Sequence, residues 1–272
     1  MRPELPFAAG LCVVMGQIFA LGGVPSAPAA LYGFFSIFFI SAAILVLNDY
    51  FDIESDKINS PHRPIPSGAV SPAEALIWAS VLFASGIGLS YLPGIIAFAT
   101  ALVVALTGFL YNRKYKKSGL PGNLMVSFSV GMTFIYGGIS VGMPFNHTAW
   151  FFGLIAALVD LGEEIAADAM DAEGDKLINS KSIAITYGRR TALRISAVMF
   201  ASVIVLSSVP FILGWFTYIY LIPVGIMVLS IGYCTLRLLK SQGDEGRKHI
   251  RNLYLGATAG ILVFLVMRVS GV

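Results

Sequence analysis

Histidine and cysteine are scarce in this sequence, and so are charged residues. The 272 residues include three histidines and two cysteines. Cys12 and Cys234 both lie in apolar stretches, where a thiol behaves as a small hydrophobic group. No Cys and His spacing suggests zinc, and no disulfide framework is implied. Charged residues make up 12% of the chain and hydrophobic residues 57%, which excludes a soluble globular domain and indicates an integral membrane protein.

The apolar residues form runs long enough to cross a lipid bilayer, which requires roughly 18 or more mostly apolar residues in a helix. Nine such runs lie near residues 5–24, 28–47, 72–92, 94–111, 122–142, 148–167, 192–213, 215–236 and 252–269. No polar linker separates them, so we expect one all-α, polytopic membrane domain covering residues 1–272. An alternative interpretation of the first run is a signal peptide, because Arg2 precedes it and small residues follow it.

The basic residues occupy loops on one predicted side of the membrane. Lys and Arg follow the second, fourth, sixth and eighth runs, whereas the loops after the first, third, fifth and seventh runs carry no Lys, Arg, Asp or Glu. Arg268 is the exception. The positive-inside rule assigns the basic side to the cytoplasm, where we expect the active site of a multi-pass cell-membrane protein. Such a basic rim contacts membrane lipids and requires no nucleic-acid partner.

One group of carboxylates begins where the second run ends. It comprises the carboxylates Asp49, Asp52 and Asp56 and the amide of Asn48 beside them. At about 100° per residue, Asn48, Asp52 and Asp56 fall within about 80° on a helix, and Asp49 adds about 20° to that arc. We therefore expect one acidic face at this helix end.

A second group of carboxylates follows the sixth run. Glu164, Asp168, Asp171 and Asp175 lie within about 60° on a helix that continues through Gly174. Like charges packed this closely repel, and carboxylates beside hydrocarbon are costly, so both groups require a cation. Ligand sets made only of oxygen suit Mg²⁺.

The two acidic groups also suggest an internal repeat. Each runs into a short basic segment with Asn and Ser, at residues 56–60 and 175–181. A parallel repeat would bring the two helix ends together across a pseudo-two-fold axis along the membrane normal. Chance similarity of two short segments is the alternative.

A lipid diphosphate bound through Mg²⁺ accounts for both acidic groups and for the basic loops around them. Metal ions would neutralise the charge of the departing diphosphate, and aromatic faces would stabilise the allylic cation that remains. The proline-rich loop 60–68 is rigid enough to hold Arg63 over such a site. The basic residues 113, 114, 116 and 117 have two interpretations, as substrate contacts or as topology and head-group signals.

The glycines in the fifth run also have two interpretations. Gly131, Gly137 and Gly138 suit close packing of helices in lipid. They would equally leave a groove for a prenyl tail.

The acidic motifs and the proline-rich loop resemble those of a known family. Asn48-Asp49-x-x-Asp52-x-x-x-Asp56, followed by Arg63-Pro64-Ile65-Pro66-Ser67-Gly68 and later by Asp171-x-x-x-Asp175, is similar to the UbiA superfamily of intramembrane prenyltransferases. The resemblance covers essentially the whole chain, including Tyr111 and Gly122-Asn123. It implies a UbiA-type helical bundle, Mg²⁺-dependent transfer of a prenyl group from a prenyl diphosphate, and metal-diphosphate binding at Asn48, Asp52, Asp56, Asp171 and Asp175.

The acidic faces and the resemblance together define the candidate site residues. The candidate metal ligands are Asn48, Asp49, Asp52, Asp56, Asp168, Asp171 and Asp175. The candidate diphosphate contacts are Asn48, Lys57, Arg63, Tyr111, Lys117, Asn123 and Lys181. The residues expected to carry catalysis are Asp52, Arg63, Asp171 and Asp175.

Within the superfamily, residues 56–61 and 173–176 most resemble archaeal digeranylgeranylglyceryl phosphate synthases. This implies geranylgeranyl diphosphate as donor and geranylgeranylglyceryl phosphate as the lipid-soluble acceptor. The chain departs from those enzymes at Leu5, Glu163 and Ala167, where they often carry Asn, Arg and Lys. An aromatic acceptor of quinone or chlorophyll-type biosynthesis is therefore the alternative. A secondary transporter is a more distant one, since transporters usually hold paired carboxylates near the membrane midplane.

Overall fold

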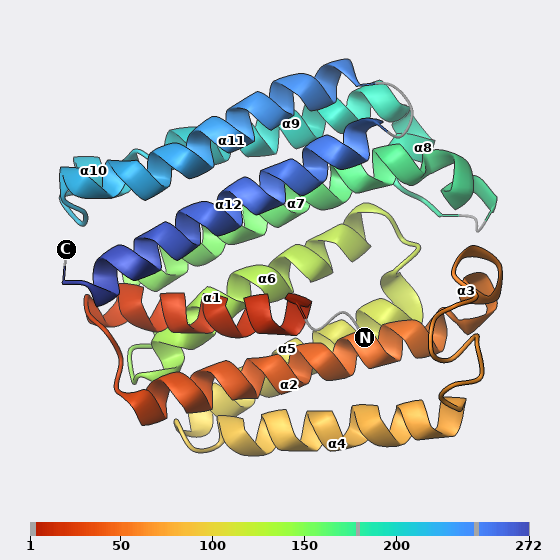
Figure 1. The fold of residues 1–272 in the computed structure, drawn as a ribbon, viewed down its shortest axis with the longest axis horizontal. Helices are drawn as coiled ribbons and strands as arrows, with labels where there is room; N and C mark the ends of the chain where they lie inside the picture. Colours follow the sequence, from red (N-terminus) through yellow and green to blue (C-terminus); the bar gives the residue numbers. More distant parts are fainter. Residues whose placement is uncertain (1–3, 178–179, 242–244, 272) are drawn as a thin grey trace. The chain divides into compact units, whose positions relative to one another are not determined.

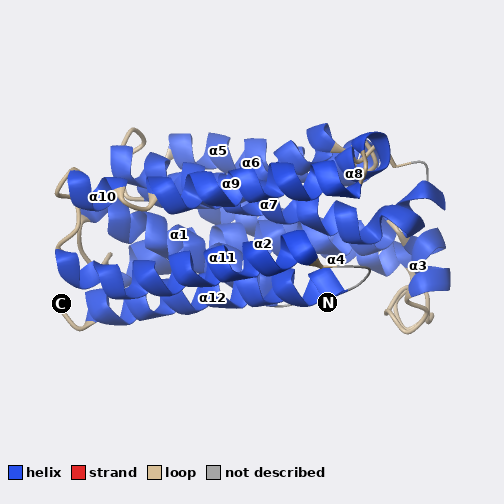
Figure 2. Cartoon of the chain, turned by 90° about the horizontal axis from the view of Figure 1, so that it is seen from above, coloured by secondary structure: helices blue, strands red, loops and turns tan. Residues whose placement is uncertain are grey.

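Every regular element in the described part of the chain is a helix (Figure 2). The computed structural model describes residues 4–177, 180–241 and 245–271, except for the side chains of residues 55, 58, 59 and 173–177. The long helices are α1 (Glu4–Leu21), α2 (Ala27–Phe51), α4 (Pro72–Ser90), α5 (Ile95–Leu110), α6 (Leu120–Ser140), α7 (His147–Leu177), α9 (Arg189–Leu206), α11 (Leu221–Lys240) and α12 (Glu245–Val269). The short ones are α3 (Ile53–Asn59), the π-helix η1 (Tyr111–Tyr115), α8 (Ile183–Tyr187), α10 (Val209–Ile212) and the 3₁₀-helix η2 (Tyr218–Tyr220). The all-α prediction is confirmed.

The helices match the runs predicted to cross the membrane. In the described residues, eight helical segments are long and apolar enough to span a bilayer. The remaining predicted run, 148–167, lies within α7, where Asp160, Glu163 and Glu164 make the helix more acidic than an ordinary span. Carboxylates are expensive inside a membrane, so this departure marks α7 as a helix with a function beyond anchoring.

α5 shows how these helices are adapted to lipid. Its small residues face inward, with Ala97 1% and Ala101 0% exposed. Its large apolar residues face outward, with Val103 51% and Leu106 57% exposed. This pattern is the reverse of a soluble helix, because small residues let helices approach closely while large ones contact acyl chains. The chain is therefore an integral membrane protein.

The chain divides into two compact units, and each contains one of the two acidic groups. The first unit comprises Met1–Lys116 and Phe128–Leu154, and the second comprises Lys117–Ser127 and Ile155–Val272. In the first unit, α2 packs against both α1 and α4, and in the second, α11 packs against α9 and α12 (Figure 1). The single-domain organisation and the pseudo-two-fold repeat stay predictions.

Two glycines allow α1 and α6 to pack closely within the first unit. A Cβ atom on Gly16 would lie 2.1 Å from the Phe134 carbonyl oxygen, and one on Gly137 would lie 2.3 Å from the Val13 carbonyl oxygen. Neither distance is tolerable, so only glycine fits at these positions. For Gly137 the packing interpretation is therefore the right one, and the face that it presents to α1 is filled by backbone rather than open as a groove.

Candidate active site

The first acidic group lies at a junction between two helices. α2 ends at Phe51 and α3 begins at Ile53, and Asp52 between them has φ −93° and ψ 4°. The Asp52 amide donates to the Asn48 carbonyl at 3.0 Å and the Asp56 amide to the Asp52 carbonyl at 2.8 Å, so helical hydrogen bonding continues past the break. The helix is therefore interrupted at Asp52, where ψ departs from the helical value, and the single acidic face at this helix end stays a prediction.

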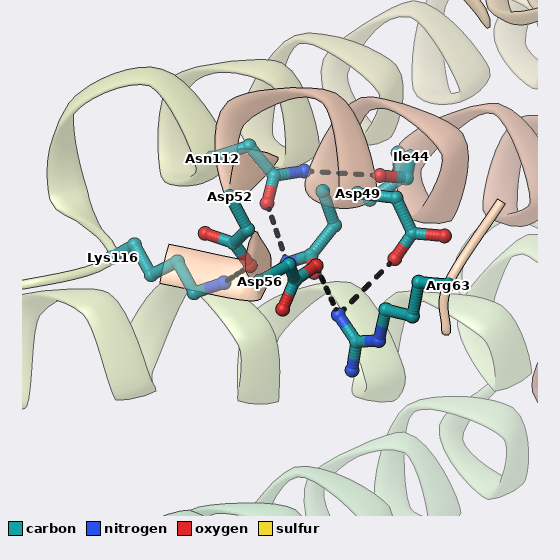
Figure 3. A network of polar contacts seen from close by, with 8 residues as sticks. Ile44, Asp49, Asp52, Asp56, Arg63, Asn112 and Lys116 are labelled. Atoms are coloured by element: carbon teal, nitrogen blue, oxygen red, sulfur yellow. Dashed lines mark hydrogen bonds and ion pairs between the residues drawn. The ribbon is translucent and has the colours of Figure 1, made fainter. Parts of the chain in front are cut away.

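Arg63 lies between two of these carboxylates. Its Nη1 contacts Asp56 Oδ2 at 2.6 Å and Asp49 Oδ1 at 3.5 Å (Figure 3). Backbone turns hold the loop in place, since the Arg63 amide donates to the Ser60 carbonyl at 3.0 Å and the Arg63 carbonyl accepts from the Ser67 amide at 3.0 Å. The loop thus presents Arg63 to the acidic group, as its proline-rich sequence predicted. Contact with a diphosphate stays a prediction.

The third carboxylate of the group, Asp52, pairs with a lysine from another helix. Lys116, just after η1, forms an ion pair with Asp52 Oδ2 (Figure 3). The Asn48 amide adjoins both residues.

A π turn and a close helix contact place Lys116 there. The Lys116 amide donates to the Tyr111 carbonyl at 2.8 Å, an i to i+5 bond. Four residues of an α-helix rotate by about 400°, so residues spaced by four drift off a common face. A π turn takes more residues per turn and reduces this drift, so Lys116 stays on the face that is directed toward α2. Such turns are frequent at functional sites.

The contacts of α5 and η1 with α2 and Asp52 form a regular series. Gly108 lies against Ile44, because a Cβ on Gly108 would be 2.3 Å from Ile44 Cδ1. The buried Asn112 donates to the Ile44 carbonyl at 3.1 Å and accepts from the Asn48 amide at 2.9 Å. Residues 108, 112 and 116 thus face residues 44, 48 and 52. This alignment fixes the end of α5 beside the first acidic group.

The second acidic group is held by α6 and α12. Asn123 donates from Nδ2 to Asp168 Oδ2 at 2.9 Å, and Asp171 forms an ion pair with Arg247. Burial raises the pKa of the Asp168 carboxyl, the Asn123 hydrogen bond opposes this rise, and the charge of Asp171 adds to it. The side chain of Asp175, a predicted metal ligand, lies outside the described residues.

The remaining predicted diphosphate contacts lie in different surroundings. Lys57 is exposed and pairs with Glu54 at 2.8 Å rather than with the acidic group. Lys117 and Lys181 lie side by side, because the Lys181 amide donates to the Lys117 carbonyl at 3.0 Å. Tyr111 supplies the carbonyl that closes the π turn. Their contacts with a diphosphate stay predictions.

The structure adds residues that the sequence reasoning did not select. They are Asn112, Lys116, Ser127, Asp160 and Arg247. In the sequence, Lys116 is one of four similar basic residues. Asp160 had a usable signal, since it is a carboxyl inside an apolar run. The partners of the others depend on contacts between helices.

The first acidic group has the donor chemistry that Mg²⁺ requires. Among the described side chains, no three His, Cys, Asp or Glu residues are arranged to hold a metal ion. The carboxylates of Asp49, Asp52 and Asp56 instead pair with Arg63 and Lys116. Carboxylate oxygens beside an amide are nevertheless suitable Mg²⁺ ligands, and a dication would compete with the two basic side chains for them. The residues therefore fit this metal.

Comparison with known proteins identifies the family. The profile of the UbiA prenyltransferase family matches residues 9–265. The chain belongs to the UbiA prenyltransferase family. It is therefore an enzyme that transfers prenyl groups, as its motifs indicated, and the transporter alternative is not supported.

Relatives of this UbiA prenyltransferase include digeranylgeranylglyceryl phosphate synthases from archaea. That of Thermococcus kodakarensis is 36% identical over 245 residues, covering 90% of this chain and 87% of the relative. That of Thermococcus gammatolerans is 36% identical over 264 residues, covering 97% of this chain and 94% of the relative.

Solved structures share the fold. One, from work on digeranylgeranylglyceryl phosphate synthase in membranes, has a TM-score of 0.80 and 32% identity, covering 97% of this chain and 94% of the other. A UbiA homolog from Aeropyrum pernix has a TM-score of 0.84 at 17% identity, covering 97% and 99%. A UbiA homolog from Archaeoglobus fulgidus, solved with GPP and Mg²⁺, has a TM-score of 0.71 at 17% identity, covering 96% and 95%. The predicted UbiA-type bundle is confirmed.

Proposed function

We propose that this UbiA prenyltransferase transfers the geranylgeranyl group of geranylgeranyl diphosphate to the hydroxyl of geranylgeranylglyceryl phosphate, a step of archaeal membrane lipid synthesis. The observation that carries the proposal is the 36% identity with two Thermococcus digeranylgeranylglyceryl phosphate synthases over 90% and 97% of this chain. The aligned residues cover nearly the whole chain and 87% and 94% of the two relatives.

Mg²⁺ is the cofactor that we propose. Asp49, Asp52 and Asp56 would bind it in one unit, and Asp168, Asp171 and Asp175 in the other. When bound, the metal would neutralise the negative charge that develops on the departing diphosphate. The homolog from Archaeoglobus fulgidus, whose structure contains GPP and Mg²⁺, supports this choice.

Arg63 and Lys116 are proposed to bind the diphosphate. Both pair with carboxylates that a metal would occupy, so metal binding would release their charges beside the substrate. The guanidinium of Arg63 can donate two parallel hydrogen bonds to phosphate oxygens, whereas the Lys116 ammonium acts as a compact charge. These side chains would orient the diphosphate and hold it after the bond to the prenyl group breaks.

The membrane determines how the substrates arrive. Burying a C20 tail is favourable by roughly 0.8 kcal/mol per CH₂ group, so on the order of 10 kcal/mol opposes its release into water. We propose that donor and acceptor both enter from the lipid, and that the head-group site faces the cytoplasm, where the basic loops are expected.

An acceptor panel tests the proposal. Purified enzyme in detergent receives Mg²⁺, labelled C10, C15 and C20 diphosphates, and either geranylgeranylglyceryl phosphate or aromatic acceptors, with products separated by mass. We expect the highest kcat/KM for the C20 donor with geranylgeranylglyceryl phosphate. Products formed only from aromatic acceptors would overturn the acceptor assignment and leave prenyl transfer intact.

A further inference from the structure

Asp160 extends the acidic face of α7 into the membrane. It precedes Asp168 by eight residues, which is about 12 Å along a helix, and it lies inside the predicted run 148–167. At about 100° per residue, Asp160, Asp168 and Asp171 fall within about 80° of one another. Asp160 therefore shares a face with the candidate metal ligands, on the side of them that lies deeper in lipid.

Asp160 is held by a hydroxyl and not by a cation. The Ser127 hydroxyl, on α6, lies 2.9 Å from Asp160 Oδ2 and 2.8 Å from the Asn123 carbonyl oxygen, and its single proton can be donated to one of them at a time. Ser127 is 3% exposed. One turn earlier on α6, Asn123 donates to Asp168. In the part of the chain that the structure describes, Asp160 has no Arg, Lys or His partner, in contrast to Asp52 with Lys116.

A carboxyl of this kind is costly in a membrane and usually marks a functional site. Its cost is not offset by an ion pair, so packing alone does not explain why α7 carries an aspartate there. The depth of Asp160 in the membrane indicates which part of a bound substrate it would face. If a diphosphate binds near Asp168, its apolar prenyl tail would lie in the membrane interior, on the side where Asp160 lies.

The proposed reaction leaves one proton to be removed. The bond between the prenyl C1 and the diphosphate oxygen breaks with its electron pair on the diphosphate, and the acceptor hydroxyl oxygen forms the new bond to C1. The hydroxyl proton must then pass to a base. We propose that the Asp160 carboxylate accepts this proton and later returns it to water, an assignment that rests on the proposed function. The Ser127 hydroxyl contacts Oδ2, so Oδ1 is the oxygen that we assign to the acceptor hydroxyl.

Asp160→Asn tests the assignment, because it keeps the shape of the side chain and removes the base. We expect kcat to fall by about 100-fold or more, the usual contribution of general-base catalysis. The donor KM and the affinity for Mn²⁺, measured by electron paramagnetic resonance, should not change. Glu163→Gln is the comparison on the same helix, since it removes the neighbouring carboxyl whose charge acts on Asp160 and leaves Asp160 itself in place, and it should lower kcat far less than Asp160→Asn.

An acceptor analogue with a thiol in place of the hydroxyl separates a base from a structural residue. A thiol with a pKa of about 8.5 is half ionised at pH 8.5 and needs no protein base. We expect the defect of Asp160→Asn to shrink to less than about tenfold with this acceptor. Ser127→Ala should show a smaller defect that the thiol also relieves.

Three results would overturn the assignment. They are an equal defect of Asp160→Asn with hydroxyl and thiol acceptors, a parallel loss of Mn²⁺ affinity, or activity equal to wild type. Each leaves the proposed function standing, provided that the wild-type enzyme transfers prenyl groups. A wild-type enzyme that transfers none would overturn both.

Discussion

The Lys116 ammonium, just after η1, pairs with the Asp52 carboxylate and so joins the end of η1 to the junction between α2 and α3 (Figure 3). Asp52 is also a proposed Mg²⁺ ligand, so the lysine and the metal compete for one carboxylate. Competition of this kind couples metal binding to diphosphate binding, because the lysine charge becomes available when the metal displaces it. The first two predictions address each partner in turn.

Asp52→Asn should reduce kcat/KM by about 100-fold or more, because it removes one charged ligand of a metal that supplies several kcal/mol of transition-state stabilisation. Steady-state kinetics and Mn²⁺ titration measure the two consequences. The control is Glu54→Gln, which removes a carboxylate from the exposed side of α3. Full activity of Asp52→Asn without added metal would rule out the metal site.

Lys116→Met should raise the affinity for Mn²⁺ in the absence of diphosphate by about two- to fivefold, the range for loss of a solvent-accessible ion pair, since the two side chains are 32% and 21% exposed. It should weaken donor binding by about 10- to 100-fold, since a hydrogen bond to a charged group is lost. Lys114→Met is the control, because its exposed side chain lies over the Tyr115 ring instead of a carboxylate. If both variants behave alike, Lys116 has no special role.

Arg63→Ala should lower kcat/KM for the donor by roughly 1.5 to 3 kcal/mol, and Arg63→Lys should recover only part of the loss because an ammonium lacks the guanidinium geometry. The melting temperature of the metal-free protein should also fall, since Asp49 and Asp56 lose their shared counter-ion. His62→Ala, at the exposed neighbouring position, is the control. Unchanged donor kinetics would transfer the role to Lys57 or to the basic residues 113–117.

Gly108→Ala should destabilise the protein by about 1 to 3 kcal/mol, because the added methyl overlaps Ile44 at 2.3 Å. It should also lower activity, since the α5 and α2 contact that places Lys116 is disturbed. Gly88→Ala is the control, because a Cβ there meets nothing within 4 Å and replacing a helical glycine is favourable by roughly 0.5 to 1 kcal/mol. Thermal unfolding in detergent compares the two, and an equal or greater stability of Gly108→Ala would contradict the contact.

The sequence by itself determined the helical membrane architecture, the acidic groups and the family. Apolar runs, basic loops and the spacing of Asp52 and Asp56 are local patterns, and each has a direct physical meaning along one helix. The same reasoning placed Arg63 correctly, because prolines restrict the loop that carries it.

Only the tertiary structure decided which side chains work together. The π turn at Tyr111–Tyr115 and the Gly108 contact select Lys116 from four similar basic residues, and the backbone of Asp52 ends α2 earlier than the helical pattern implied. The pairing of Ser127 with Asp160 joins residues 33 positions apart. Such contacts depend on how closely two helices approach and on the rotation of each, and neither quantity is encoded in the periodicity of a single helix.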